Sequence, residues 1–161
     1  MIAITKKNYL LTNRITNNKT IFNIITKQIP RSIFTILDAD LFKKIIKDKV
    51  IEVFVIKKKN KIVSVISVIK NKNYIFLKKE IFFYFLTKPH KLFLNIFFII
   101  AMFGRSSSNI KSSNDKNYLH LLHLVIFKNY FKSITLKKKD EIINFFLRKI
   151  IKKYDAKYFY L

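Results

Sequence analysis

The last quarter of the chain combines strand and helix in an order that constrains the topology more than any other segment. The apolar run Leu119–Phe127 is typical of a strand, and 137–153 carries apolar residues at helical spacing. The closing stretch "DAKYFYL" is typical of a second strand. Because the chain crosses the sheet through the helix before the second strand begins, the two strands are expected to run parallel, with a right-handed crossover.

The middle of the chain predicts antiparallel strands. The β-branched runs "KVIEVFVI" and "KIVSVISVI" are separated by "KKKN", Lys57–Asn60, which has the length of a hairpin turn. A third short apolar run, "YIFL" at 74–77, follows the polar stretch Lys70–Asn73. We therefore expect a meander of two or three strands. Together with the parallel tail, this predicts an α+β fold in three layers, with a mixed, mostly antiparallel sheet flanked by helices.

Helical segments precede and follow this meander. Residues 2–5 are expected to form a short first strand. Apolar residues recur at helical spacing in 21–29, and Pro30 ends that segment because proline disfavours helix in the residue before it. Ser32 stands in an N-cap position before a second helical stripe at 33–48. The sequence predicts two more helices ahead of the tail, at Lys79–Leu86 and Pro89–Phe103.

The most apolar run is "LFLNIFFIIAMF", Leu92–Phe103. A helix of this length spans about 18 Å, short of the roughly 30 Å hydrocarbon core of a bilayer. Extending it backward meets Lys88, Pro89, His90 and Lys91. No membrane span is therefore expected. A buried core helix is the favoured interpretation, and a helix lying on a membrane surface is the alternative.

Length and composition indicate one domain over residues 1–161. Residues 104–117 hold the only glycine and five serines, which predicts a flexible loop. The chain has no cysteine, and its three histidines lack zinc-ligand spacing, so no metal site is expected. No signal peptide is apparent at the N-terminus, which predicts a cytoplasmic location.

The formal net charge of +24 has two interpretations. Only four of the 33 basic residues are arginine, whereas bidentate phosphate recognition favours arginine. The abundant residues Phe, Ile, Asn, Lys and Tyr have codons built from A and T, so an AT-rich genome explains most of the charge. Attraction to an anion explains the rest of the positive charge. This charge is the only feature of the sequence that indicates nucleic acid as a partner.

Three stretches resemble the GNAT family of acetyl-CoA-dependent N-acetyltransferases. "QIPRSIFTILDADLFKKII" is similar to the acceptor-side helix region, and "IEVFVIKKKNKIVSVISVI" to the central hairpin. "LHLLHLVIFKNYF…IINFFLRKIIKKYDAKYFYL" is similar to the cofactor core. The resemblance implies a GNAT-like acyl-CoA N-acyltransferase fold without its last helix and strands. It also implies acetyl transfer from acetyl-CoA to a small-molecule or peptide amine.

The resemblance implies a cofactor site on the strand and the turn after it. Backbone groups of Leu124, Val125 and Ile126 would meet the pantetheine arm, and the turn would meet the pyrophosphate. The turn residues in this role are Phe131, Lys132, Ser133, Ile134, Thr135 and Leu136. Lys132, Ile134 and Leu136 stand where the family has glycines, and their side chains would crowd the phosphates. The run Lys137–Lys139 adds positive charge.

Catalytic candidates are Glu52, His120 and His123. For each of them a structural interpretation is favoured, as an alternating polar residue for Glu52 and as a partly buried histidine for the other two. The odd spacing of the two histidines places them on opposite faces of their strand. Asp38 and Asp40 are open to a role on the acceptor side or on a helix surface.

The family's tyrosine acid has no counterpart here, and the exposed C-terminal strand is a possible contact for a homodimer. The function therefore has two alternatives to acetyl transfer: a catalytically inactive remnant of the GNAT fold, or a basic organellar ribosomal or RNA-associated protein.

Overall fold

The computed structural model describes residues 3–13, 17–29, 38–94, 96, 100, 118–127 and 136–160. In chain order the elements are β1 Ala3–Lys6, β2 Tyr9–Thr12, α1 Asn18–Gln28, α3 Ala39–Lys47, β3 Glu52–Lys58, β4 Lys61–Lys70, α4 Asn71–Thr87, α5 Pro89–Leu94, β5 Tyr118–Ile126, α7 Leu136–Lys153 and β6 Tyr158–Tyr160.

The strands form one six-stranded sheet in the order β1-β2-β3-β4-β5-β6. Every neighbouring pair is antiparallel except β5 and β6, which are parallel. This confirms the predicted α+β class, the mixed sheet and the parallel tail. The β3–β4 hairpin also lies where the β-branched runs predicted it. β6 is an edge strand, and its predicted pairing with a second copy stays a prediction.

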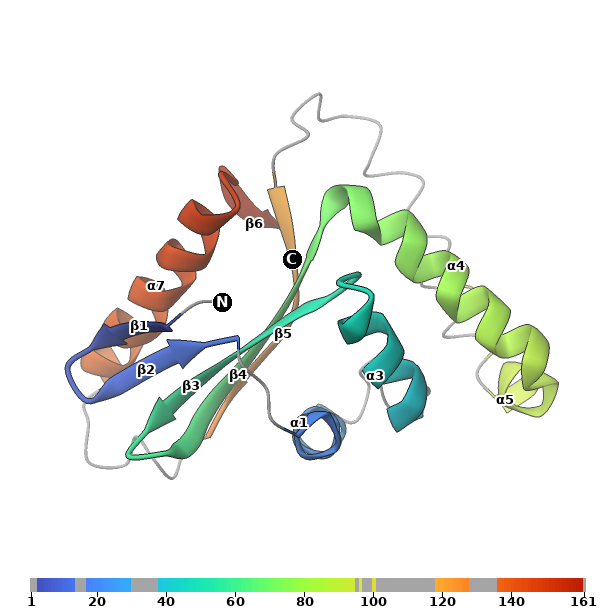
Figure 1. Ribbon diagram of the computed structural model, residues 1–161, viewed down its shortest axis with the longest axis horizontal. Coiled ribbons are helices and arrows are strands. Elements are labelled where there is room, and N and C mark those ends of the chain that lie inside the picture. Colours follow the sequence, from blue (N-terminus) through green and yellow to red (C-terminus); the bar gives the residue numbers. More distant parts are fainter. Residues whose placement is uncertain are drawn as a thin grey trace.

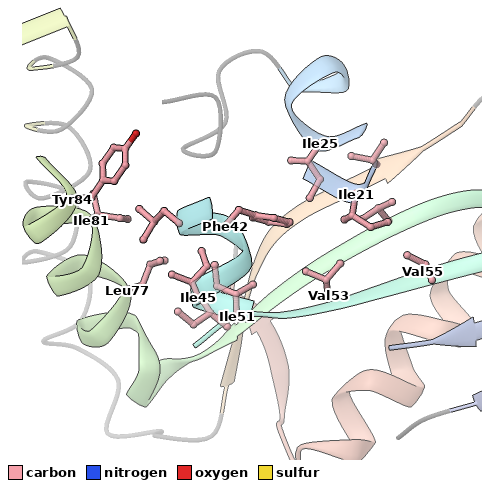
Figure 2. Close-up of a cluster of buried hydrophobic side chains, with 14 of the residues drawn as sticks. Ile21, Ile25, Phe42, Ile45, Ile51, Val53, Val55, Leu77, Ile81 and Tyr84 are labelled. Atoms are coloured by element: carbon pink, nitrogen blue, oxygen red, sulfur yellow. The ribbon is translucent and has the colours of Figure 1, made fainter. Parts of the chain in front are cut away.

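Helices cover both faces of the sheet, because alternate residues of the central strands point to opposite sides. Val53 and Val55 of β3 pack against α1, α3 and α4, whose buried side chains are shown in Figure 2. Phe54 and Ile56, which alternate with these valines along β3, pack against α7 on the other side. Figure 1 shows α1, α3 and α4 on one side of the twisted sheet and α7 on the other. The fold therefore has three layers: helices α1, α3 and α4, then the sheet, then helix α7.

The predicted third meander strand is wrong, since residues 74–77 belong to helix α4. Leu77, Ile81, Tyr84 and Phe85 recur at helical spacing along α4 and are all buried against the first core. A short apolar run fits both a strand and a buried helix by pattern, and here the longer helical repeat decides.

Strand β2 lies in a segment for which the sequence predicted no strand. Its residues Tyr9, Leu11 and Thr12 are buried, and it pairs with both β1 and β3. The turn from β1 includes Lys7, whose φ of 53° is in the left-handed region. Because this hairpin carries no glycine or proline, the usual sequence signal for a turn is missing.

The N-cap observed for α3 is Asp38, whose Oδ1 accepts a hydrogen bond from the Leu41 amide at 2.9 Å. The predicted cap at Ser32 lies outside the described residues.

Helix α5 begins at Pro89, as predicted. The described side chains of the apolar run that it enters are Phe93, Ile96 and Ile100, and all three are exposed. For these residues the interpretation as a buried core helix is wrong. The predicted loop at 104–117 lies outside the described residues. Among the helices that the structure describes, none is long and apolar enough to span a bilayer.

Candidate functional site

Strand β5 carries a β-bulge beside the predicted catalytic histidines. Ser67 of β4 pairs with His123 and the next residue, Val68, pairs with Leu121, so Leu122 is an extra residue. A bulge bends its strand, shifts the alternation of side chains by one position, and is common next to active sites.

The bulge brings the two histidines to the same face of the sheet, so the prediction of opposite faces is wrong. His120 pairs across the strands with Ile69, and His123 pairs with Ser67, two residues earlier on β4. Ile69 belongs to the core beneath α1, α3 and α4, and His120 stacks on Tyr74 of α4. The odd spacing alone would place the two histidines on opposite faces of the sheet. The extra residue Leu122 shifts the alternation by one position, so both side chains lie on the same face.

His123 is part of a buried polar pair. Its Nδ1 lies 2.7 Å from Oγ of Ser67, and both residues are buried. Burial lowers the pKa of His123 to about 4, so its imidazole is neutral near pH 7. Ser67 was not among the sequence candidates, although a serine inside an apolar strand is a polar group that needs a partner.

His120 lies between aromatic rings at the end of the β5–β6 pairing. Its ring stacks on Tyr74 with 4.7 Å between centroids and meets the edge of Tyr118 at 5.0 Å. Burial lowers its pKa below the ordinary 6.5. The side chain is less buried than that of His123. It is therefore a neutral base at pH 7 on the strand that the resemblance assigns to the cofactor.

Strand β6 accompanies β5 over three residues only. The pairs are Tyr118 with Tyr158, Leu119 with Phe159, and His120 with Tyr160. Within the described part of the chain, residues 121–126 have a strand neighbour on the β4 side alone. We call this the open edge of β5, meaning that from the bulge onward it has no strand partner among the described residues.

The direction of the backbone groups along this open edge follows from two hydrogen bonds to β4. The Phe127 amide donates to the Val63 carbonyl at 3.0 Å, and the Ser64 hydroxyl donates to the Val125 carbonyl at 2.8 Å. Since backbone groups alternate along a strand, those of Leu124 and Ile126 point away from β4. Two of the three predicted pantetheine contacts thus face the open edge, whereas Val125 faces β4.

The N-terminus of α7 is strongly basic. Leu136 is its exposed first residue, Lys137–Lys139 follow, and the first turn has no acidic side chain. Positive side chains are unfavourable at this end of a helix, where the helix dipole is itself positive. An anion bound here would offset both charges. The turn residues Phe131–Thr135 lie outside the described residues.

Glu52 lies at the start of β3 beside a cavity of about 430 Å³. Its Oε2 accepts hydrogen bonds from the Lys153 ammonium at 3.1 Å and from the Tyr154 hydroxyl. Burial and the neighbouring carboxylate raise the pKa of Tyr154, so the phenol stays protonated and donates. The cavity is lined by Asn13, Asn18, Ile46, Lys49, Ile51, Glu52, Val53 and Lys153.

The structure does not bring Glu52 to the open edge of β5. Glu52 pairs with Val68, which pairs with Leu121, so two strand spacings of about 4.8 Å each separate them. The side chain also lies on the α7 side of the sheet, whereas the histidines lie on the opposite side. Lys153 and Tyr154 were missed by the sequence prediction because they follow Glu52 by about a hundred residues.

Asp38 has a structural role. In addition to capping α3, its Oδ2 accepts hydrogen bonds from the Tyr84 hydroxyl at 3.1 Å and from Lys88. Burial raises the pKa of Asp38, but the hydrogen bonds from Lys88, the Leu41 amide and Tyr84 outweigh it, and the net pKa is lowered. This network ties α3 to α4. Asp40 is exposed on α3.

Comparisons of the chain with known protein families, with curated proteins and with solved structures find no match. Among the described residues, no three His, Asp or Glu side chains lie close enough together to hold a metal ion.

Proposed function

We propose that the chain is an acetyl-CoA-dependent N-acetyltransferase with a GNAT-like fold. The observation that carries this proposal is the open edge of β5, which begins at the bulge of a strand that is followed in the chain by the basic N-terminus of α7. The strand, the helix and the parallel strand follow one another in the order that the resemblance implies.

The described residues fit the two halves of the cofactor. An extended pantetheine arm carries amides, which match the outward backbone groups of Leu124 and Ile126. The diphosphate matches the α7 N-terminus and Lys137–Lys139, where the positive dipole and the lysines act together.

A bound acetyl-CoA supplies an acetyl group activated as a thioester. We assign the role of assisting this transfer to His120, which lies on β5 at the last residue pair before the open edge. Because burial lowers its pKa, His120 is neutral at pH 7 and can take the proton released as the acceptor amine attacks. Tyr74 and Tyr118 contact the ring by stacking and by an edge contact, which fix its orientation.

Reversing the charge at the α7 N-terminus is expected to weaken acetyl-CoA binding. The variant Lys137→Glu/Lys138→Glu removes two cations and should raise the Kd by about tenfold or more. The same change places two acids in the first turn of α7, where each favours the helix by roughly 0.3–1 kcal/mol. Loss of binding would therefore occur in a protein at least as stable as the parent. Calorimetry with acetyl-CoA, alongside thermal unfolding, measures both.

The matched control for this experiment is Lys43→Glu/Lys47→Glu. Both lysines are exposed on α3, on the opposite side of the sheet, and the net charge changes by the same amount. The control is expected to retain binding. Equal weakening by both variants would mean that only the overall charge attracts the cofactor. A folded parent protein that binds no acetyl-CoA at millimolar concentration would instead support the non-catalytic form of the fold.

Replacing His120 is expected to slow acetyl transfer without affecting cofactor binding. His120→Gln should lower kcat by about 10²–10⁴-fold, the usual contribution of a general base, and remove its limb from the pH–rate profile. Amine acetylation assayed with a panel of primary amines, next to calorimetry, separates the two quantities. If Glu52→Gln abolishes transfer and His120→Gln does not, the base is Glu52 and the acceptor enters the cavity beside it.

A further inference from the structure

Helix α4 is apolar on the side that faces solvent as well as on the side that faces the core. Its exposed apolar residues are each between 53% and 63% accessible: Ile75, Phe76, Phe82, Phe83 and Leu86. At 3.6 residues per turn they lie within an arc of about 120°. The opposite arc is buried in the first core. We call the exposed set the outer face of α4.

The outer face is not an ordinary solvated helix surface. A helix at the surface of a globular protein normally turns polar residues outward, and contiguous exposed apolar patches mark interaction sites. From Ile75 to Leu86 the face is about 17 Å long. Phe93 of α5, which packs against α4, is also highly exposed, as are Ile96 and Ile100 farther along the chain.

The charges around this face select an anionic partner. Residues 71–94 contain five lysines and one acid. The acid, Glu80, is held in an ion pair with Lys44 at 2.6 Å, and one of the lysines, Lys88, is held in an ion pair with Asp38. Lys79 is exposed within the arc of the outer face itself. A second copy of the chain would bring its own charge of +24, and the repulsion disfavours self-association.

The side-chain types on the outer face distinguish lipid from nucleic acid. Single-stranded nucleic acids stack their bases on aromatic rings beside a basic groove. Ile75 and Leu86 cannot stack in this way, yet they are as exposed as the phenylalanines. A mixture of Phe, Ile and Leu with flanking lysines is typical of helices that lie in the interface of an anionic bilayer.

We propose that the outer face of α4, continued by Phe93, docks on the surface of an anionic lipid bilayer. The apolar side chains enter the boundary between headgroups and acyl chains, and Lys79 extends its ammonium to the phosphates. In Figure 1, α4 lies on the side of the sheet away from α7, so docking leaves the α7 side uncovered. The proposal does not depend on the acetyltransferase function.

Flotation of the full chain with vesicles tests the proposal. The chain is expected to float with vesicles of equal parts phosphatidylcholine and phosphatidylserine, and to stay behind with phosphatidylcholine alone. Phe82→Ser/Phe83→Ser should reduce the bound fraction at least about tenfold, because two large apolar side chains no longer enter the bilayer. Both residues are exposed, so the variant is expected to fold like the parent.

The control variant is Leu136→Ser, which removes an exposed apolar side chain from α7 and should leave flotation unchanged. Equal flotation of the parent and the double-serine variant would overturn the proposal, since charge alone would then explain binding. It would also be overturned if the double-serine change abolished binding to single-stranded RNA, or self-association in sedimentation, while the parent ignored the vesicles.

Discussion

Replacing Phe146 by alanine is expected to lower the free energy of unfolding by about 3–5 kcal/mol. The side chain is fully buried at the centre of α7 and packs in the second core with Phe54, Ile66 and Ile150. Among the described helices, α7 alone covers this face of the sheet, so little else can close the cavity. Urea unfolding followed by circular dichroism measures the change.

The neighbouring Phe145 provides a matched control for this substitution. It loses the same atoms on mutation to alanine, but it is only partly buried at the border of the same core, where Lys6 and Lys149 lie over its ring. A loss of about 1 kcal/mol is expected for Phe145→Ala. Similar losses for both variants would contradict the position of α7 on the sheet.

The parts of the fold that could be predicted have long repeats of one period. The β3–β4 hairpin and the β5–α7–β6 tail have their strands and helix within a few residues of the predicted limits. These segments carry enough apolar residues in one pattern for local sequence to specify the element. The strand–helix–strand order of the tail also indicated that its two strands run parallel, as β5 and β6 do, although the helical connection from β4 to β5 joins antiparallel strands.

The parts that could not be predicted depend on partners distant in the sequence. The bulge at Leu122 exists only in the register between β4 and β5, so counting residues along β5 gave the wrong face for one histidine. Glu52 meets Tyr154 because α7 ends beside the start of β3, which no local pattern shows. A catalytic or structural role for such residues becomes visible only once the sheet is assembled.

In the candidate site, too, local sequence predicted the element, whereas the contacts with distant strands could not be predicted. The predicted strand Leu119–Phe127, which contains Leu124–Ile126, is observed as β5 Tyr118–Ile126, and its open edge supports the proposed function. Sequence spacing could not indicate which of its backbone groups are already bonded to β4. That information comes from the hydrogen bonds made by Val63 and Ser64.

Lowering the pH from 7 to 4 is expected to reduce the free energy of unfolding by about 3 kcal/mol through His123 alone. Its pKa is about 4 in the folded protein and 6.5 when exposed. Between pH 6.5 and 4, His123 therefore binds a proton in the unfolded chain but stays mostly unprotonated in the folded chain. The stabilisation is complete above this pH, declines as the pH falls, and stops changing below about 4.

The contribution of His123 has to be separated from those of other groups, because their titration also lowers the free energy of unfolding as the pH falls. His120, with its lowered pKa, also favours unfolding on acidification, and so does Asp38 at lower pH. The variant His123→Gln keeps a hydrogen-bonding side chain opposite Ser67 but does not titrate. Between pH 7 and 4, its free energy of unfolding should therefore decrease by about 3 kcal/mol less than that of the parent.

The variant Ser67→Ala serves as the control. It removes the hydrogen bond at 2.7 Å and should keep most of the pH dependence, since burial rather than this bond lowers the pKa of His123. If His123→Gln shows the same pH dependence as the parent, then folding does not lower the pKa of His123, and its side chain is not buried as described.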